Sequence, residues 1–351
     1  MGRRKPMIGI NGKWIGHPMT GTERYGTEVS KRVIRSLGSA ATLFIPKSAP
    51  IPAWIGDCRV VRSRLDGNAF EQIALPWLAR NHHLISVGGP APLAKRNQTV
   101  TLFDASVFRF PDTFGKAFSM WYRFMYLVLA RTAKSVVTIS EFSAIEISDV
   151  TRTRRKHFTV ALCGSDHYRD LAPRKPDLDI PEVFVVCVGT MALRKNLVPV
   201  SAALAEAGVN TVIVGASGKA KVFGKQRVHP AASDSLIFAG RLSDEEIAWL
   251  YEHAVALVFP SLYEGFGLPI VEAQTRRCPV VCSDEPIMHE VGGSSVLYFN
   301  SNSPSEAVAR VAELRESVGL REKLIEAGVR NSARFSWDAT TEIILGIARN
   351  R

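Results

Sequence analysis

The chain has 351 residues, more than the roughly 100–200 of a typical single domain, which predicts two domains. Its 46% hydrophobic and 22% charged residues exclude a disordered or fibrous protein. The net charge of +11 belongs to the first half, since residues 1–175 hold 27 lysines and arginines against 12 acidic residues, whereas residues 176–351 hold 17 against 21.

A basic first half attracts polyanions, which include an anionic membrane surface, a phosphorylated acceptor and nucleic acid. Solubility is the alternative reason for such a charge. No nucleic-acid-binding motif accompanies it, so we expect no nucleic-acid partner.

The five cysteines are odd in number and form no CxxC pair, which indicates a reducing compartment. Residues 8–14 are too few and too polar for a signal-peptide core, and no apolar run reaches the roughly 20 residues that span a bilayer. We therefore expect a cytoplasmic protein, peripheral at most on the inner face of the plasma membrane.

Short apolar runs alternate with helical patterns along the first half. Such alternation predicts a parallel, doubly wound sheet. The expected strands are Ile8–Asn11, Ala41–Ile45, Thr99–Phe103 and Ser135–Ile139.

A proline-rich, charged segment, Leu171–Pro181, separates this half from a second series of strands and helices. We place the domain boundary there, with one domain at residues 1–172 and another at residues 173–333. In the second half, Ser243 and Glu246 form a capping box that starts a helix. The expected strands are Val183–Val188, Thr211–Val214, Leu236–Phe238, Ala256–Phe259 and Val280–Ser283.

The segment Phe259–Ala273 predicts a strand, a glycine turn and a helix. Gly265 and Gly267 allow the backbone to approach a ligand, and the first turn of the helix offers free N–H groups to a phosphate or sugar. Glu264 in the turn and Glu272 in the helix supply acceptors for sugar and ribose hydroxyls. Two surface glutamates beside a common turn are the alternative interpretation.

Two further turns follow predicted strands. Arg194 and Lys195 come after Val183–Val188 and carry the charges that neutralise a diphosphate, unless they are a solvated surface pair. The turn Phe238–Ser243 has the glycine that brings backbone groups to a nucleotide base.

Taken in chain order, from Gly189–Asn196 through Phe238–Ser243 to Pro260–Glu272, these segments resemble glycosyltransferase family 4, and the resemblance covers most of residues 183–299. It implies the GT-B fold, in which two Rossmann-like domains face a central cleft. Residues 334–351 resemble the family's C-terminal helix, which crosses back to the first domain. The first domain would then bind the acceptor and the second the donor.

The first half adds a weaker resemblance. Thr20–Tyr25 is similar to the family's glycine loop at the reaction centre, and Glu71–Gln72, Phe103–Phe108, Trp121–Arg123 and Ile139–Ser143 look like bacterial mannosyltransferases that build O-antigen and exopolysaccharide. This subfamily suggests mannose as the transferred sugar.

The resemblance implies a role for each matching residue. Arg194 and Lys195 would hold the donor diphosphate, Glu272 the ribose and Glu264 the donor sugar. The residues expected to act in catalysis are Asp104, Arg194, Lys195 and Glu264. Those expected to bind the nucleotide sugar are Gly21, Thr22, Gly189, Thr190, Arg194, Lys195, Gly240, Arg241, Leu242, Glu264, Gly265, Phe266, Gly267, Leu268 and Glu272.

The chain departs from the family at Phe103, where a histidine that contacts the donor sugar is usual. Asp104 remains available, and His82 and His83 are alternatives that we weigh against structural roles. Asp177–Asp179 resembles a metal-binding DxD, but it lies in the proline-rich linker and we reject it. No other set has metal-ligand spacing, so we expect no metal and no cofactor besides the donor substrate.

The leading hypothesis is retaining transfer of a hexose, from GDP-mannose, to a lipid-linked saccharide or lipopolysaccharide acceptor. Glucosyl, galactosyl or rhamnosyl donors are the first alternative, and a catalytically weak, sugar-nucleotide-binding partner subunit is the second. A membrane surface is an expected partner of the basic half. Its candidate contacts are Arg152, Arg154, Arg155, Lys156, Trp121, Tyr122, Phe124 and Tyr126, although apolar spacing of this kind is more typical of a core.

Overall fold

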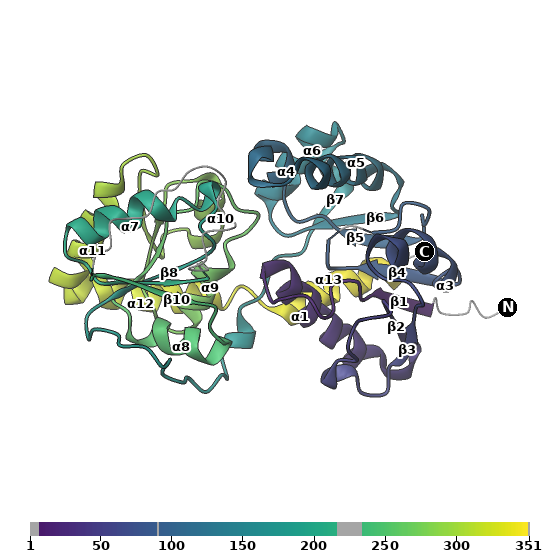
Figure 1. Ribbon diagram of the computed structural model, residues 1–351, viewed down its shortest axis with the longest axis horizontal. Helices are drawn as coiled ribbons and strands as arrows, with labels where there is room; N and C mark the ends of the chain where they lie inside the picture. The colour runs from purple at the N-terminus through teal and green to yellow at the C-terminus, as the bar shows by residue number, and fades with distance from the viewer. Residues whose placement is uncertain (1–6, 90, 216–233, 350–351) are drawn as a thin grey trace. The chain divides into compact units, whose positions relative to one another are not determined.

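The computed structural model describes residues 7–89, 91–215 and 234–349. It divides into two compact units, one of Met1–Cys163 with Ser336–Arg351 and one of Gly164–Phe335 (Figure 1). The chain passes between them after Cys163 and after Phe335, whereas the sequence suggested boundaries after residues 172 and 333. The first boundary lies earlier in the structure than the sequence suggested, because Ser165 and Tyr168 are hydrogen-bonded to Thr275 and Arg276 of the second unit.

Unit 1 is built on a seven-stranded sheet of order β3-β2-β1-β4-β5-β6-β7 in which all pairs are parallel. Its strands are β1 Met7–Asn11, β2 Ala41–Ile45, β3 Arg59–Arg62, β4 His82–Ser86, β5 Gln98–Thr101, β6 Ser135–Thr138 and β7 Phe158–Val160. The predicted doubly wound sheet is confirmed, and it includes three strands, β3, β4 and β7, that the sequence did not predict.

The helices of unit 1 include a π-helical turn, Phe70–Ala74, between α2 and α3. The last helix, α13, packs on α1, where Arg32 Nε donates to Asp338 Oδ1 at 2.7 Å and the rings of Tyr25 and Trp337 meet edge to face. The helices are α1 Gly21–Leu37, α2 Gly67–Ala69, α3 Leu75–Leu78, α4 Ser106–Arg109, α5 Lys116–Thr132, α6 Glu141–Thr151 and α13 Trp337–Arg349.

Unit 2 contains a six-stranded parallel sheet of order β10-β9-β8-β11-β12-β13. Its strands are β8 Val185–Val188, β9 Thr211–Val214, β10 Leu236–Gly240, β11 Leu257–Phe259, β12 Val280–Ser283 and β13 Leu297–Phe299. Its helices are α7 Leu197–Glu206, α8 Asp244–His253, α9 Leu268–Thr275, α10 Pro286–Gly292, α11 Pro304–Glu316 and α12 Val318–Ser332.

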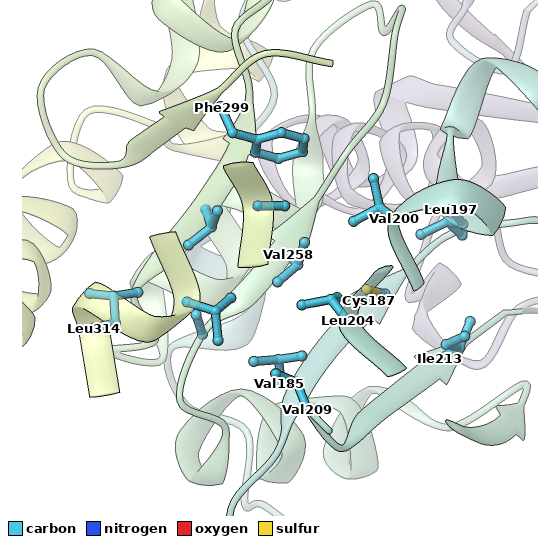
Figure 2. Close-up of a cluster of buried hydrophobic side chains, with 14 of the residues drawn as sticks. Val185, Cys187, Leu197, Val200, Leu204, Val209, Ile213, Val258, Phe299 and Leu314 are labelled. Carbon is cyan, nitrogen blue, oxygen red and sulfur yellow. The ribbon is translucent and has the colours of Figure 1, made fainter. Parts of the chain in front are cut away.

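Aliphatic side chains join this second sheet to its helices. Val185 of β8, Leu204 of α7 and Leu314 of α11 share one fully buried cluster (Figure 2). The capping box predicted at Ser243 is present, since its hydroxyl accepts from the N–H of Glu246 and the Glu246 carboxylate accepts from the N–H of Ser243. Tight aliphatic packing fixes where each strand ends and so where the following loops begin.

Strand order reverses once in each sheet, between β1 and β4 in unit 1 and between β8 and β11 in unit 2. Open parallel sheets bind ligands at this point, beyond the carboxyl ends of the strands, because the flanking connections leave in opposite directions. The loops after β8 and β11 are those in which the sequence placed its donor-binding residues.

Candidate functional site

The loop after β8 brings two cations to the carboxyl edge of the second sheet. Arg194 and Lys195 lie in a 3₁₀ turn, Leu193–Lys195, which ends at Asn196 in the left-handed region (φ 52°). Asparagine tolerates this conformation better than most residues. The Asn196 amide donates to Ser301 O at 2.9 Å, so the turn is fixed to the body of the unit.

The loop between β11 and α9 is buried from Tyr263 to Gly267. Gly267 has φ 102°, a conformation that glycine adopts without strain, and Pro269 occupies the first turn of α9. The N–H of Leu262 donates to Arg194 O at 2.8 Å, which joins the two loops at the reversal of strand order.

Glu264 lies between the two cations. Its Oε2 accepts from Arg194 Nη1 at 3.3 Å and its Oε1 accepts from Lys195 Nζ. Burial opposes ionisation of Glu264, but the charges of Lys195 and Arg194 outweigh burial, so the pKa of Glu264 lies below its ordinary value. The cluster therefore carries one negative and two positive charges, a net charge of +1 that favours an anionic ligand.

Glu272 lies in α9 and is 8% exposed. It faces His167, whose Nε2 is 3.4 Å from Glu272 Oε1. His167 belongs to the 3₁₀ turn Asp166–Tyr168, which Thr275 Oγ1 holds against α9 by donating to Ser165 Oγ at 2.8 Å. We did not predict His167 from the sequence, and its only signal there is a histidine beside the interdomain segment.

The remaining donor candidates of unit 2 also follow parallel strands. Gly189 follows β8, and a Cβ on Gly215, after β9, would lie 3.1 Å from Gly189 O, so these two turns touch. Gly240 ends β10 with φ 66°, and its carbonyl accepts from the N–H of Gly215 at 2.6 Å. The turns after β8, β9 and β10 therefore meet at one edge of the sheet, and Thr190 directly follows Gly189 in the first of them.

Arg241 and Leu242 follow Gly240 and lead into α8. Arg241 is exposed, whereas Leu242 is half-buried. Arg194 and Lys195 both contact Glu264, whereas Glu272 contacts His167.

In unit 1, Gly21 and Thr22 form the first turn of α1, directly after the loop that follows β1. Asp104 follows β5, and its Oδ1 accepts from the N–H of Ser106 at 2.7 Å, an arrangement that starts α4. The neighbouring Phe103 ring packs edge to face on Tyr25, with centroids 5.3 Å apart. The aromatic residue at the family's histidine position is therefore part of the packing around α1.

The hypothesis that His82 or His83 approaches a reaction centre is wrong. Both lie at the amino end of β4, opposite the edge where the functional loops gather. His83 is buried between Asn97 Oδ1 (2.9 Å) and Thr99 Oγ1 (2.8 Å), and His82 packs on the ring of Phe44. Both histidines thus have structural surroundings.

A cavity of about 160 Å³ opens at the carboxyl edge of the unit 1 sheet. It is lined by the loops after β1, β2 and β3, with Lys13, Ser48 and Asp66 among its polar residues. Lys13 Nζ donates to the fully buried Glu71 at 2.7 Å. Burial raises the pKa of Glu71, and the charge of Lys13 opposes that rise only in part.

Within residues 7–89, 91–215 and 234–349, no three histidine, cysteine or acidic side chains gather as metal ligands would. The rejected Asp177–Asp179 segment lies outside every helix and strand. Within those same ranges, no helix is both long and apolar enough to cross a bilayer.

Residues 169–330 match the family model for "Glycosyl transferases group 1". The chain is 28% identical over 290 residues to the O-antigen chain mannosyltransferase B of Escherichia coli, an alignment that covers 76% of this chain and 75% of the relative.

Two solved structures share the fold over nearly the whole chain. Sucrose-phosphate synthase from Thermosynechococcus elongatus has a TM-score of 0.77 at 17% identity, with 99% of this chain and 98% of that one covered. Anabaena HepE, solved with UDP and glucose, has a TM-score of 0.72 at 15% identity, with 97% and 98% covered. At 17% and 15% sequence identity, the similarity to these two structures shows a shared fold and nothing further.

Proposed function

Because the chain is a glycosyltransferase with a group 1 domain at residues 169–330, we propose that it transfers mannose from GDP-mannose, with retention, to a lipid-linked saccharide or lipopolysaccharide. This transfer would take place on the inner face of the plasma membrane, as a step in the synthesis of a bacterial surface polysaccharide.

The observation that carries this proposal is the cluster of Arg194, Lys195 and Glu264 at the reversal of strand order. In the transfer, the bond between the sugar C1 and the diphosphate oxygen breaks, and the bonding electrons go to that oxygen. The acceptor hydroxyl forms the new bond to C1 on the face from which the diphosphate departs, and its proton goes to the departing diphosphate oxygen. Two fixed cations beside the departing diphosphate stabilise the charge that develops there, and no metal is needed in this scheme.

The other site residues fit the rest of a nucleotide sugar. Glu264, with the amides of Gly265 to Leu268 at the start of α9, suits the sugar hydroxyls, because a carboxylate accepts hydrogen bonds and a helix N-terminus donates them. Glu272 suits the ribose hydroxyls. The turns at Gly189 and Gly240 would lie along the phosphates and the base. For unit 1, the role of Gly21 and Thr22 in binding the nucleotide sugar and the role of Asp104 in catalysis stay predictions.

Mannose is supported by the name of the Escherichia coli relative. Glucose, galactose or rhamnose is the alternative within the same chemistry, since the fold is shared with a structure that binds UDP and glucose. We assign the acceptor to unit 1, where the cavity beside Lys13 offers both donors and acceptors to a saccharide.

The test is a thermal-shift screen of GDP-, UDP- and dTDP-sugars, followed by measurement of nucleoside diphosphate release with acceptor lipids. We expect GDP-mannose to raise the melting temperature of the wild type and Glu272→Ala to lose that rise. Glu326→Ala is the matched control, because Glu326 is an exposed glutamate of the same unit. A rise for no sugar nucleotide, or an equal rise in Glu272→Ala, would contradict the assignment. Binding without any release would favour the partner-subunit alternative that Phe103 suggests.

A further inference from the structure

Helix α5 carries an exposed stripe of large apolar side chains. Met120, Phe124 and Leu127 are 70%, 50% and 38% exposed. Together with Lys116 and Arg131 they follow a spacing of three or four residues, which places all five on one face of the helix. The stripe thus has an apolar centre with a cation at each end, and we call it the α5 stripe.

The opposite face of α5 is anchored in unit 1. Met125, Tyr126 and Leu129 are buried in the cluster that also contains residues of β5 and β6. Arg123 Nε donates to Val107 O at 2.7 Å, which holds the helix to α4. The α5 stripe is therefore presented by a fixed helix, and the core of the unit does not use it.

This arrangement corrects part of the sequence-based expectation. Of the aromatic residues predicted to touch a membrane, Tyr126 is buried and Trp121 and Tyr122 are half-buried, so only Phe124 is exposed. Met120 and Leu127, which the sequence pattern did not single out, take the exposed positions beside it.

Positively charged residues outnumber negatively charged ones around the α5 stripe. Residues 104–156, which include α4, α5 and α6, hold nine lysines and arginines against five acidic residues, of which Asp112 is the one that lies nearest to Lys116 in the chain. In the neighbouring α6, Glu146 and Asp149 both pair with Arg109, at 2.7 and 2.8 Å, so this group of three residues keeps one negative charge. Glu141 is likewise paired with Arg155. The stripe therefore lies in a positive field.

We propose that the α5 stripe docks the protein on an anionic lipid bilayer, with Met120, Phe124 and Leu127 in the acyl boundary and Lys116 and Arg131 among the headgroups. A helix of this kind lies in the interface plane, where apolar burial and attraction to anionic lipid act together. Lys116 and Arg131 are fifteen residues apart, or roughly 22 Å along the axis, so both reach one flat surface. A second copy of the same face would bring like charges together, which disfavours self-association. The inference rests on the proposed function in one respect, namely that a lipid-linked acceptor lies in such a membrane.

The experiment is co-sedimentation of the full chain with vesicles of phosphatidylcholine alone or with 30% phosphatidylglycerol. We expect binding to the anionic vesicles that weakens with salt, and a loss of about tenfold or more in the triple variant Met120→Glu, Phe124→Glu, Leu127→Glu. The control is Ile73→Glu with Trp77→Glu, which adds acidic groups at exposed apolar positions elsewhere on unit 1 (69% and 65% exposed). Equal loss in both variants, or no binding of the wild type to anionic vesicles, would overturn the proposal.

Two further readouts separate the alternatives. A wild type that is dimeric by light scattering, with a monomeric triple variant, would assign the stripe to a second copy instead. The triple variant should keep the thermal shift with a donor nucleotide, because that site lies in unit 2. If no sugar nucleotide shifts the wild type while lipid binding persists, the proposed function fails and the docking surface stands.

Discussion

Replacement of Glu264 by glutamine separates the electrostatic role of the cluster from the role in holding the sugar that we propose for Glu264. Glutamine keeps the shape and two polar atoms but removes the charge between Arg194 and Lys195. The three side chains are only 11–19% exposed, so their interaction is little screened. Loss of one partner of a buried ion pair costs about 3–5 kcal/mol, and the one hydrogen bond that the glutamine oxygen can still accept brings our expectation to about 3 kcal/mol. For a unit of this size that corresponds to a fall of roughly 6–12 °C in melting temperature.

Nucleotide binding should change in the opposite direction. Without the carboxylate, the cluster carries a net charge of +2 in place of +1, so a nucleoside diphosphate alone should raise the melting temperature of Glu264→Gln more than that of the wild type. The corresponding sugar nucleotide should give the variant no gain over the diphosphate, because the acceptor for the sugar hydroxyls is weakened. Calorimetry with and without ligand measures both effects, since it resolves the two units if they melt separately.

The matched control is Glu326→Gln, which changes an exposed glutamate of α12 (68% exposed) and should leave every melting temperature within about 1 °C. Two results would refute the reasoning. One is a Glu264→Gln protein as stable as the wild type, and the other is a smaller response to the diphosphate.

Four further outcomes are expected from the structure. Because the folded-state pKa of Glu264 is lowered, its contribution to stability is present at neutral pH and is lost on acidification below about pH 4. The pKa of Glu71 is raised, so its ionised form becomes costly to the folded state as pH rises. Glu71→Gln should therefore cost less stability at pH 7 than Glu264→Gln, and urea unfolding at several pH values measures the difference. His167→Ala should raise the donor KM about tenfold with little change in kcat, since it removes the contact that orients Glu272, and His253→Ala should leave both constants unchanged. Gly267→Ala should destabilise unit 2 by about 1–3 kcal/mol because its φ of 102° strains any side chain, while Gly319→Ala, at an open helical position, should be neutral or stabilising in the same melts. Phe103→His should increase nucleoside diphosphate release several-fold in steady-state assays if that position contacts the donor sugar, and an unchanged rate would assign Phe103 to packing on Tyr25 alone.

The strands that the sequence predicted are those with continuous apolar runs, and β2, β9 and β12 begin and end at the predicted residues. Three of the strands that it missed, β3, β7 and β13, are edges of their sheets. An edge strand packs on one neighbour only and is kept short or polar, so its pattern is weak. The fourth, β4, is central but contains His82 and His83, whose burial depends on Asn97, Thr99 and Phe44 from other segments.

For the site too, features that depend on adjacent residues were predictable, and contacts between residues distant in the sequence were not. A glycine turn before a helix is a local feature, so the turn at Gly267 and the start of α9 were predictable from adjacent residues. The pairing of Glu264 with Arg194 and Lys195 joins positions about 70 residues apart, and the sequence indicated only that they belong to loops at one edge of a sheet. The contact between His167 and Glu272 was not predictable, because it depends on where the chain crosses into unit 2.

The composition of the cluster constrains how it can act. A lone Arg-Lys pair would bind any polyanion, and its mutual repulsion would leave the two side chains poorly fixed in the absence of a ligand. With Glu264 between them, the pair is already oriented, so a diphosphate that arrives meets donors that need no reorganisation. The same carboxylate limits the net charge to +1, which weakens attraction to a free diphosphate relative to an intact donor whose sugar hydroxyls donate to Glu264. If the cluster binds the donor as we propose, the arrangement favours the substrate over the product of the reaction, and the Glu264→Gln measurement tests this preference.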